Sequence, residues 1–267
     1  MTKAVRKAGH LLTEWNQVAN RIAVRRGVVV FLDFDGTLVD IAPRPELVRF
    51  RRAARVALQR LVRNRNARVV IISGRRRAEL LQHVGIRGIQ YFGLYGWERS
   101  ANSVMPSSVR SALNRARKKL DFQLRAYPSV WVENKVSSLS IHLLDAPAAI
   151  QDIVRQHLRA ALEAFKRELK MVENIRDLEI LPRSFPSKGD TVRRLLSQSA
   201  FRRSFPFYFG DDFSDESGFA AVRAGASILV GEARETRARY SLQNPSEVAT
   251  ALARIDTLVD DKNQPER

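Results

Sequence analysis

GVVVFLDFDGTLVD, residues 27–40, is the stretch that decides the fold. Its first half, Val28–Leu32, is a run of β-branched and aromatic residues with a glycine before it and an acidic turn after it. This pattern predicts a short buried strand that ends at Asp33 and Asp35. In open α/β sheets the ligand crevice lies outside the carboxyl ends of the strands, so the same stretch predicts where the chemistry takes place.

The two carboxylates after this strand indicate a charged site. Alternate residues of a strand share a face, so we expect Asp33 and Asp35 to point the same way. Two carboxylates held that close repel each other unless a cation or a shared proton compensates, and an oxygen-only pair suits a hard divalent ion such as magnesium. Gly36 lets the backbone turn tightly, and Thr37 offers a hydroxyl and an amide on which a phosphate can rest.

Length and composition set the broad class of the protein. A chain of 267 residues with 45% hydrophobic residues predicts one or two globular domains. No apolar run approaches the roughly 20 residues that cross a bilayer, and the first residues lack the core of a signal peptide, so we expect a cytoplasmic protein without a membrane span. The absence of cysteine excludes disulfides and thiolate metal sites, which leaves oxygen ligands or the four histidines for a metal.

The net charge of +18 is large and comes mostly from arginine. Such a charge attracts anions, including phosphorylated sugars and, without sequence preference, nucleic acid. Aromatic residues are sparse and do not alternate with the basic clusters, which argues against a stacking platform for single-stranded nucleic acid. We therefore expect a solvated arginine-rich surface and no specific nucleic-acid partner.

Other parts of the chain predict a parallel sheet with flanking helices. Short apolar runs occur at residues 67–73, 205–210, 226–231 and 240–242, and helical segments lie between them, as in βαβ units. Residues 1–26 carry apolar side chains at helical spacing and predict an amphipathic helix. We expect this helix to pack on the body of the protein or on a second subunit, and a membrane surface is the alternative.

Residues 107–182 follow a different pattern. They predict a helix, two strands, a long helix over residues 147–169 and two more strands. The order αββαββ is typical of an open-faced antiparallel sheet with helices on one side. Because this segment interrupts the parallel pattern, we predict a core domain in two parts, residues 1–106 and 183–267, and an inserted α+β domain, residues 107–182.

Three further polar motifs lie at predicted strand or helix ends. They are Ser73-Gly74-Arg75, Ser187-Lys188-Gly189-Asp190, and Gly210-Asp211-Asp212 with Asp215. Ser187 and Asp190 form a capping pair, which places Lys188 at a helix N-terminus, where amides and a cation together favour an anion. A lysine in the first turn opposes the helix dipole, so a functional role explains it better than helix stability does. The acidic loop is expected to surround a cation, and a simple turn is the alternative.

The string DFDGTL resembles the first motif of the haloacid dehalogenase superfamily, and the later motifs resemble those of its trehalose-6-phosphate phosphatases. The resemblance implies an α/β fold with a Rossmann-like parallel-sheet core and an inserted α+β cap domain that closes over the active site. It also implies that Asp33 is a nucleophile that forms an aspartyl phosphate and that Asp35 is the general acid and base.

The same resemblance assigns the remaining core motifs to phosphate and metal. Phosphate contacts are implied for Thr37, Ser73, Gly74 and Lys188. Asp211 is expected to complete a Mg²⁺ site with Asp33 and the backbone carbonyl of Asp35, while Asp212 and Asp215 orient the groups around that site. For Ser73 alone, a simple helix cap is the alternative.

Contacts to the sugar are also implied by the resemblance. The residues concerned are Arg75, Tyr95, Gly96, Glu98, Glu133, Lys135, Arg176 and Glu179. Glu133 and Lys135 lie two residues apart on a predicted strand and so share a face. An ordinary ion pair, worth under about 1 kcal/mol, is the alternative for these two. Tyr95 stands where the family usually has histidine, and Asn134 and Val136 depart from the family's Glu-Asp-Lys-Gly string.

These observations predict a magnesium-dependent phosphatase that hydrolyses trehalose 6-phosphate through an aspartyl phosphate. The departures in the cap keep another sugar phosphate open as the substrate, such as sucrose phosphate or a glycosyl-glycerate phosphate. A phosphomutase is chemically possible as well, with a sugar hydroxyl in place of water. A non-catalytic sugar-phosphate or nucleic-acid binding protein on the same fold is disfavoured because Asp33, Asp35, Lys188 and Asp211 are all present. The sequence does not indicate a protein partner.

Overall fold

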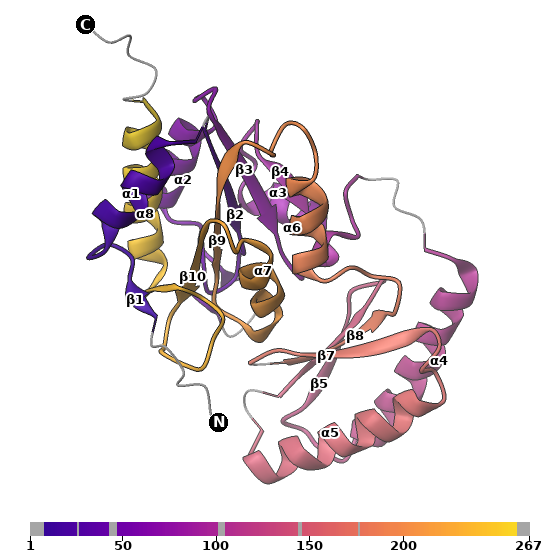
Figure 1. Cartoon of the computed structure of the whole chain (residues 1–267). Helices are drawn as coiled ribbons and strands as arrows, with labels where there is room; N and C mark the ends of the chain where they lie inside the picture. Colours follow the sequence, from indigo (N-terminus) through magenta and orange to yellow (C-terminus); the bar gives the residue numbers. More distant parts are fainter. Residues whose placement is uncertain are drawn as a thin grey trace, which may run out of the picture. The chain divides into compact units, whose positions relative to one another are not determined.

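The computed structural model describes residues 8–25, 27–42, 47–100, 105–143, 146–175 and 177–260. The chain divides into two compact units (Figure 1). The first, the core domain, lies within residues 1–101 and 186–267, and the second, the cap domain, lies within residues 102–185. The sequence predicts this insertion at residues 107–182, within a few residues of the observed bounds.

The core domain is built on a parallel sheet, seven-stranded within the described residues, in the order β1-β11-β10-β9-β2-β3-β4. Every strand pair among the described residues of this sheet is parallel, so the predicted α/β class is confirmed. The strands are β1 (Gly9–His10), β2 (Gly27–Leu32), β3 (Ala67–Ile72), β4 (Gln90–Phe92), β9 (Ser204–Gly210), β10 (Ala226–Val230) and β11 (Tyr240–Leu242).

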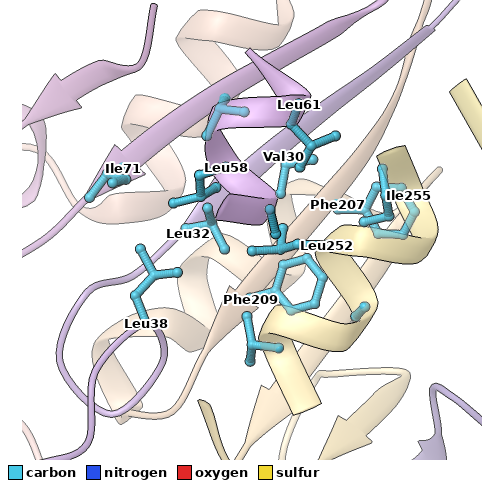
Figure 2. Close-up of a cluster of buried hydrophobic side chains, with 14 of the residues drawn as sticks. Val30, Leu32, Leu38, Leu58, Leu61, Ile71, Phe207, Phe209, Leu252 and Ile255 are labelled. Carbon is cyan, nitrogen blue, oxygen red and sulfur yellow. The ribbon is translucent and has the colours of Figure 1, made fainter. Parts of the chain in front are cut away.

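Strand β2 lies in the middle of the sheet, between β9 and β3, and is buried along its whole length. Its alternate residues enter two different apolar clusters: Val30 and Leu32 join one, and Val29 and Phe31 join the other. This explains why the strand reads as a continuous apolar run, since helices cover both faces of a parallel sheet. Figure 2 shows the first cluster, in which Val30 and Leu32 meet side chains from β9, α2 and α8.

The helices of the core are α1 (Trp15–Ala23), α2 (Arg52–Leu61), α3 (Arg77–His83), α6 (Lys188–Leu196), α7 (Glu216–Ala221) and α8 (Pro245–Asp260), with short 3₁₀ turns at η2 (Leu94–Gly96) and η3 (Phe213–Asp215). Apolar residues of α1, α2, α3 and α8 belong to the first cluster, and those of α6 and α7 belong to the second. The two helix layers hold the strand ends, and therefore the acidic loops after them, in fixed positions.

The predicted N-terminal helix over residues 1–26 is wrong in its extent. Residues 1–7 lie outside the described residues, Gly9–His10 pairs with β11 as a short parallel strand, and the helix covers only Trp15–Ala23. Glycine disfavours a helix interior, and the open edge of β11 offers its backbone groups a partner instead. Val18 and Ile22 of this helix are buried against the core, so the helix packs on the body of the protein as expected.

The cap domain has the predicted order αββαββ. Its elements are α4 (Ser107–Leu124), β5 (Trp131–Asn134), β6 (Leu139–His142), α5 (Ala148–Glu163), β7 (Leu169–Glu173) and β8 (Asp177–Pro182). The four strands pair antiparallel in the order β5-β6-β8-β7, and α4 and α5 pack together on one side of them (Figure 1). The long helix predicted over residues 147–169 ends at Glu163, because Leu169 is buried and pairs with Pro182 in the sheet.

The two faces of the cap sheet differ in chemistry. Buried apolar residues of β6 and β8 pair across the strands, Leu139 with Ile180 and Ile141 with Leu178. The residues between them along the strands are polar, and strand alternation places these on the face opposite the helices. None of the described helices of either domain combines the length and the apolar character needed to cross a bilayer.

Candidate active site

Asp33 follows the last residue of β2 and is buried. Its amide donates a hydrogen bond to the carbonyl of Phe209 on the neighbouring strand β9, at 2.9 Å. Lys188, the first residue of α6, brings its Nζ atom to 2.9 Å from Oδ2 of Asp33 and 2.8 Å from Oδ1 of Asp215. Only 2% of the lysine side chain is exposed, so this cation compensates two buried carboxylates at once.

A group of three carboxylates surrounds this point. Asp33, Asp211 and Asp215 each have an oxygen atom within 4.8 Å of the other two. Burial, and after it the charge of Asp215, raises the pKa of Asp33 to about 8 although Lys188 acts in the opposite direction. Burial and the neighbouring carboxylates also raise the pKa of Asp211 well above its usual range. One lysine does not balance three carboxylates, and their oxygen-only donor set fits a hard divalent cation.

Two glycines allow the acidic loops to approach each other this closely. Gly36 has a φ of +72°, and a Cβ atom on it would lie 2.0 Å from Oδ2 of Asp211. A Cβ on Gly210 would lie 2.3 Å from Cγ of Asp215. Glycine is therefore needed at position 36 for two reasons: the turn has a positive φ there, and a side chain would occupy the space of Asp211.

The side chain of Asp35 lies in a different environment from that of Asp33. Strand β2 ends at Leu32, so the strand alternation from which Asp33 and Asp35 were expected to point the same way does not extend to these two residues. Arg75 donates to both oxygen atoms of Asp35, from Nε to Oδ2 and from the second guanidinium nitrogen to Oδ1, each at 2.7 Å. The arginine side chain is 9% exposed and that of Asp35 is 39% exposed. The sequence placed Arg75 at the sugar, whereas the structure shows it holding the predicted general acid.

The predicted phosphate-binding residues lie at the same end of the sheet. Thr37 is fully buried and its Oγ1 donates to Oδ1 of Asp211 at 3.2 Å. Ser73 directly follows β3, is buried, and accepts a hydrogen bond from the amide of Arg75 at 3.2 Å. The N-cap of α3 is Arg76, so Ser73 is not the cap of that helix.

Residues 93–98 form a turn that packs against α6. The amide of Tyr95 donates to the carbonyl of Ser73 at 2.9 Å, and its own carbonyl accepts from Oγ1 of Thr191 at 3.0 Å. Gly96 has a φ of +106°, and a Cβ atom there would lie 1.9 Å from Oγ1 of Thr191. Tyr95 and Gly96 thus fix the position of the helix that carries Lys188, whose Nζ lies 6.0 Å from the centre of the tyrosine ring.

Glu98, a predicted sugar contact, is buried and occupies the N-terminus of α3. Its Oε2 accepts from the amide of Arg77 at 2.7 Å and its Oε1 accepts from Nε of Arg76 at 3.3 Å. A carboxylate at a helix N-terminus satisfies an amide that has no partner within the helix, so these contacts stabilise α3.

Tyr208 and Arg234, which belong to none of the sequence motifs, support the acidic loop. Tyr208 donates from its hydroxyl to Oδ1 of Asp215 at 2.7 Å, beneath the loop. Arg234 donates to the carbonyl of Asp212 at 2.9 Å and to Oε1 of Glu216 at 2.6 Å. Tyr208 left one signal in the sequence, a phenol in the otherwise apolar strand FPFYFG, whereas Arg234 is one of many arginines and left none.

Asp212 and Asp215 close this loop with local hydrogen bonds. Oδ2 of Asp215 accepts from the amide of Asp212 at 3.1 Å, and Oδ1 of Asp212 accepts from the amide of Phe213 at 2.5 Å. Asp215 is in addition a member of the three-carboxylate group, so it lies closer to the reacting centre than the sequence suggested.

Of the cap residues predicted to contact sugar, Glu133 lies on β5 and Glu179 on β8, whereas Lys135, predicted to lie on the same strand as Glu133, directly follows the last residue of β5. Nζ of Lys135 is 2.5 Å from Oε1 of Glu179, which is almost completely buried. Burial lowers the pKa of Lys135, but the charges of Glu179 and Asp177 outweigh it and raise this pKa above its usual value. Nε2 of His142 is 2.9 Å from Oε2 of Glu133. Arg176, the remaining predicted contact, lies outside the described residues.

A sequence model described as trehalose-phosphatase matches residues 31–246, which include the acidic loops, the lysine helix and the whole cap. The chain belongs to the trehalose-phosphatase family. This membership agrees with the resemblance inferred from the motifs.

Curated proteins support the same family. The probable trehalose-phosphate phosphatase 4 of Oryza sativa subsp. japonica is 28% identical over 269 residues, which cover 95% of this chain and 72% of the relative. The trehalose-phosphate phosphatase of Mycobacterium bovis is 32% identical over 248 residues, which cover 87% of this chain and 62% of the relative. The chain thus spans less than two thirds of the mycobacterial family member.

Among solved structures, the C-terminal domain of the C. albicans trehalose-6-phosphate phosphatase is similar, with a TM-score of 0.81. It shares 18% sequence identity, and the match covers 96% of this chain and 99% of that one. At this identity the likeness shows a common fold, a haloacid dehalogenase core with an inserted cap, as predicted.

Proposed function

We propose that this family member hydrolyses trehalose 6-phosphate to trehalose and phosphate with the help of Mg²⁺ and an aspartyl-phosphate intermediate. The observation that carries the proposal is the group formed by Asp33, Asp211 and Asp215 after β2 and β9 together with the buried Lys188 at the start of α6. A carboxylate nucleophile, a buried cation and an oxygen-only metal site are the parts that phosphoryl transfer from an ester requires.

In the first step an oxygen of Asp33 attacks phosphorus, and the bond from phosphorus to the sugar oxygen breaks. The nucleophile must be anionic to attack, and Lys188 at 2.9 Å favours that form. The second contact of Lys188, to Asp215, holds the ammonium group in place beside Asp33. Thr37, Ser73 and Gly74 supply the remaining phosphate contacts in this proposal.

Asp35 donates a proton to the leaving sugar oxygen and then takes one from the water that cleaves the aspartyl phosphate. The bidentate contact from Arg75 fixes the orientation of this carboxyl, while its 39% exposure leaves it accessible to substrate and water. Burial raises the pKa of Asp33, so in this proposal Lys188 and the bound cation keep that carboxylate anionic, while the exposure of Asp35 lets it exchange protons with substrate and water.

Mg²⁺ would be held by Asp33, the backbone carbonyl of Asp35 and Asp211, with Asp212 and Asp215 orienting the surrounding groups. When bound, the ion neutralises charge on the phosphate and on the carboxylates. The closely spaced carboxylate oxygens and their raised pKa values support this assignment, since a divalent cation offsets the repulsion among them.

For the sugar we propose contacts from Glu133, Lys135 and Glu179, with Arg176 as a further candidate. The buried Lys135–Glu179 pair supports this role. Burying two charges costs free energy of desolvation, and a ligand site that needs fixed donors and acceptors is a reason to retain such a pair. The other predicted sugar contacts have positioning roles in this proposal. Arg75 orients Asp35, Tyr95 and Gly96 position α6, and Glu98 stabilises the start of α3. The cytoplasmic location stays a prediction.

The test is release of phosphate, with and without Mg²⁺, from trehalose 6-phosphate, sucrose 6-phosphate, glucose 6-phosphate and a glycosyl-glycerate phosphate. We expect a preference for trehalose 6-phosphate of about a hundredfold in kcat/KM, which corresponds to roughly 2.7 kcal/mol of transition-state binding, and loss of activity with a chelator. A flat profile, or a preference for another sugar phosphate, contradicts the substrate assignment. Activity that survives chelation contradicts the role of the metal.

A further inference from the structure

An aromatic pair lies on the polar face of the cap sheet. The rings of Trp131 on β5 and His142 on β6 are stacked, with centroids 3.7 Å apart and an angle of 12° between their planes. The two residues are direct partners across the antiparallel strands. Because the imidazole covers one face of the indole and 43% of the tryptophan remains exposed, the other face is open.

The position of the indole is held by its neighbours. Nε2 of His142 lies 2.9 Å from Oε2 of Glu133, which fixes the imidazole ring. Trp131 and Glu133 are two residues apart on β5 and share the same face. The stack therefore presents a flat apolar surface with little freedom to rotate, which lowers the entropic cost of binding a ligand on it.

Polar groups lie beside this surface on the same face. They come from Lys135 with Glu179 and from Ser140, whose hydroxyl donates to Asp177. Ser140, Asp177 and Glu179 occupy the alternate positions of β6 and β8 that point away from the helices, and Lys135 directly follows β5. The polar face thus carries the aromatic stack at its β5 edge and fixed donors and acceptors on β6 and β8.

A hexopyranose ring has matching chemistry. Its axial C–H bonds form an apolar face, which favours the electron-rich face of an aromatic ring, and its hydroxyls extend from the rim toward donors and acceptors. A protein partner fits this surface less well, because a single indole ringed by charges offers little contiguous apolar area.

We propose that Trp131 is a specificity-determining residue that stacks on a glucose ring of the substrate, with His142 and Glu133 positioning its indole. This inference rests on the proposed function, since it names the part of the cap that reads the sugar. It adds to the polar contacts of the cap an apolar contact that discriminates a pyranose from other groups attached to the phosphate.

The first test compares Trp131→Phe, which keeps an aromatic face, with Trp131→Leu, which keeps an apolar side chain without one. The measured quantity is the ratio of kcat/KM for the best sugar phosphate to kcat/KM for p-nitrophenyl phosphate. We expect Trp131→Leu to lower this ratio about tenfold, mainly through KM, because loss of an aromatic contact and of buried area amounts to roughly 1.4 kcal/mol. Trp131→Phe is expected to retain most of the ratio.

The matched control is Phe122→Leu on α4. Phe122 is an aromatic residue of the same domain, 74% exposed, on the helix layer instead of the polar face. This substitution is expected to leave the ratio within about twofold of the wild type. An unchanged ratio in Trp131→Leu, or an equal loss on the sugar and aryl substrates, overturns the proposal.

A second measurement does not depend on turnover. Trehalose itself is the probe in saturation-transfer difference NMR, with signals from its ring protons expected for the wild type and for Trp131→Phe and lost for Trp131→Leu. Equal signals for all three proteins overturn the stacking contact. The substrate panel tests the proposed function separately. If the wild type prefers another sugar phosphate, the assignment of trehalose 6-phosphate fails. Trp131 is then still tested by the kcat/KM ratio for that sugar phosphate and by NMR with its dephosphorylated sugar.

Discussion

Lys188 offers the most direct test of how the site is held together. Replacing it by methionine keeps an unbranched side chain of similar length and removes the charge. In the wild type the ammonium lies 2.9 Å from Asp33 and 2.8 Å from Asp215 and is 2% exposed. Removal of one partner from a buried ion pair typically costs about 3–5 kcal/mol, because the remaining charges stay buried without compensation.

For a domain of this size each kcal/mol shifts the melting temperature by about 2–4 °C, so Lys188→Met is expected to lower it by roughly 6–20 °C at neutral pH. The measurement is thermal unfolding followed by circular dichroism. The control is Lys166→Met, which breaks an exposed pair with Glu163 and should change the melting temperature little.

The loss should depend on pH with a definite sign. Without the lysine, burial keeps the pKa of Asp33 raised in the folded protein relative to about 3.9 in the unfolded chain. A carboxyl with a raised folded pKa binds more protons when folded, so the free energy of unfolding falls as the pH rises; because the pKa of Asp33 is already about 8 in the wild type, the variant and the wild type differ in this fall only above about pH 8. The deficit of Lys188→Met should therefore be larger at about pH 9.5 than at about pH 7, and Mg²⁺ should reduce it at the higher pH. A loss no greater than that of the control, or a deficit that grows as the pH falls, would refute the reasoning.

Four further predictions concern single residues. Asp33→Asn should abolish turnover with an unchanged circular dichroism spectrum. If the variant retains more than about a tenth of the wild-type kcat, Asp33 is not the nucleophile. Tyr208→Phe deletes the hydroxyl beneath the acidic loop but keeps the ring, and should lower stability by about 1–3 kcal/mol in denaturant titrations; an unchanged midpoint would mean that the hydrogen bond contributes nothing. Asp190→Ala removes a carboxylate whose pKa the hydrogen bonds of the capping box lower to about 2, so its cost of about 1 kcal/mol at pH 7 should fade as the pH drops from about 4 toward 2, and a cost independent of pH would contradict this. Glu133→Ala and Lys135→Ala should each reduce kcat/KM strongly on the sugar phosphate and weakly on an aryl phosphate, whereas equal losses would show that these residues do not read the sugar.

Local patterns in the sequence predicted the parts of the fold that depend on short-range chemistry. The apolar run before Asp33 formed a buried strand, as did residues 67–73 and 205–210 to within a residue or two. The capping box of Ser187 and Asp190 is present and starts α6 at Lys188. Helix extents were less predictable: apolar spacing continued through residues 1–26 and 147–169, but in each case part of the segment joins a sheet edge or strand instead.

Within the site, the sequence by itself determined which acids, hydroxyls and lysine stand at strand and helix ends, because those positions follow from local periodicity and from motifs of a few residues. Only the tertiary structure decided their partners. Lys188 bridges Asp33 and Asp215 because β9 pairs beside β2 and α6 begins above both, and the turn after β3 brings Arg75 to Asp35. Trp131 meets His142 because of the register between β5 and β6. Such contacts join residues far apart in the chain or fixed by strand register, and no local pattern records which strands become neighbours.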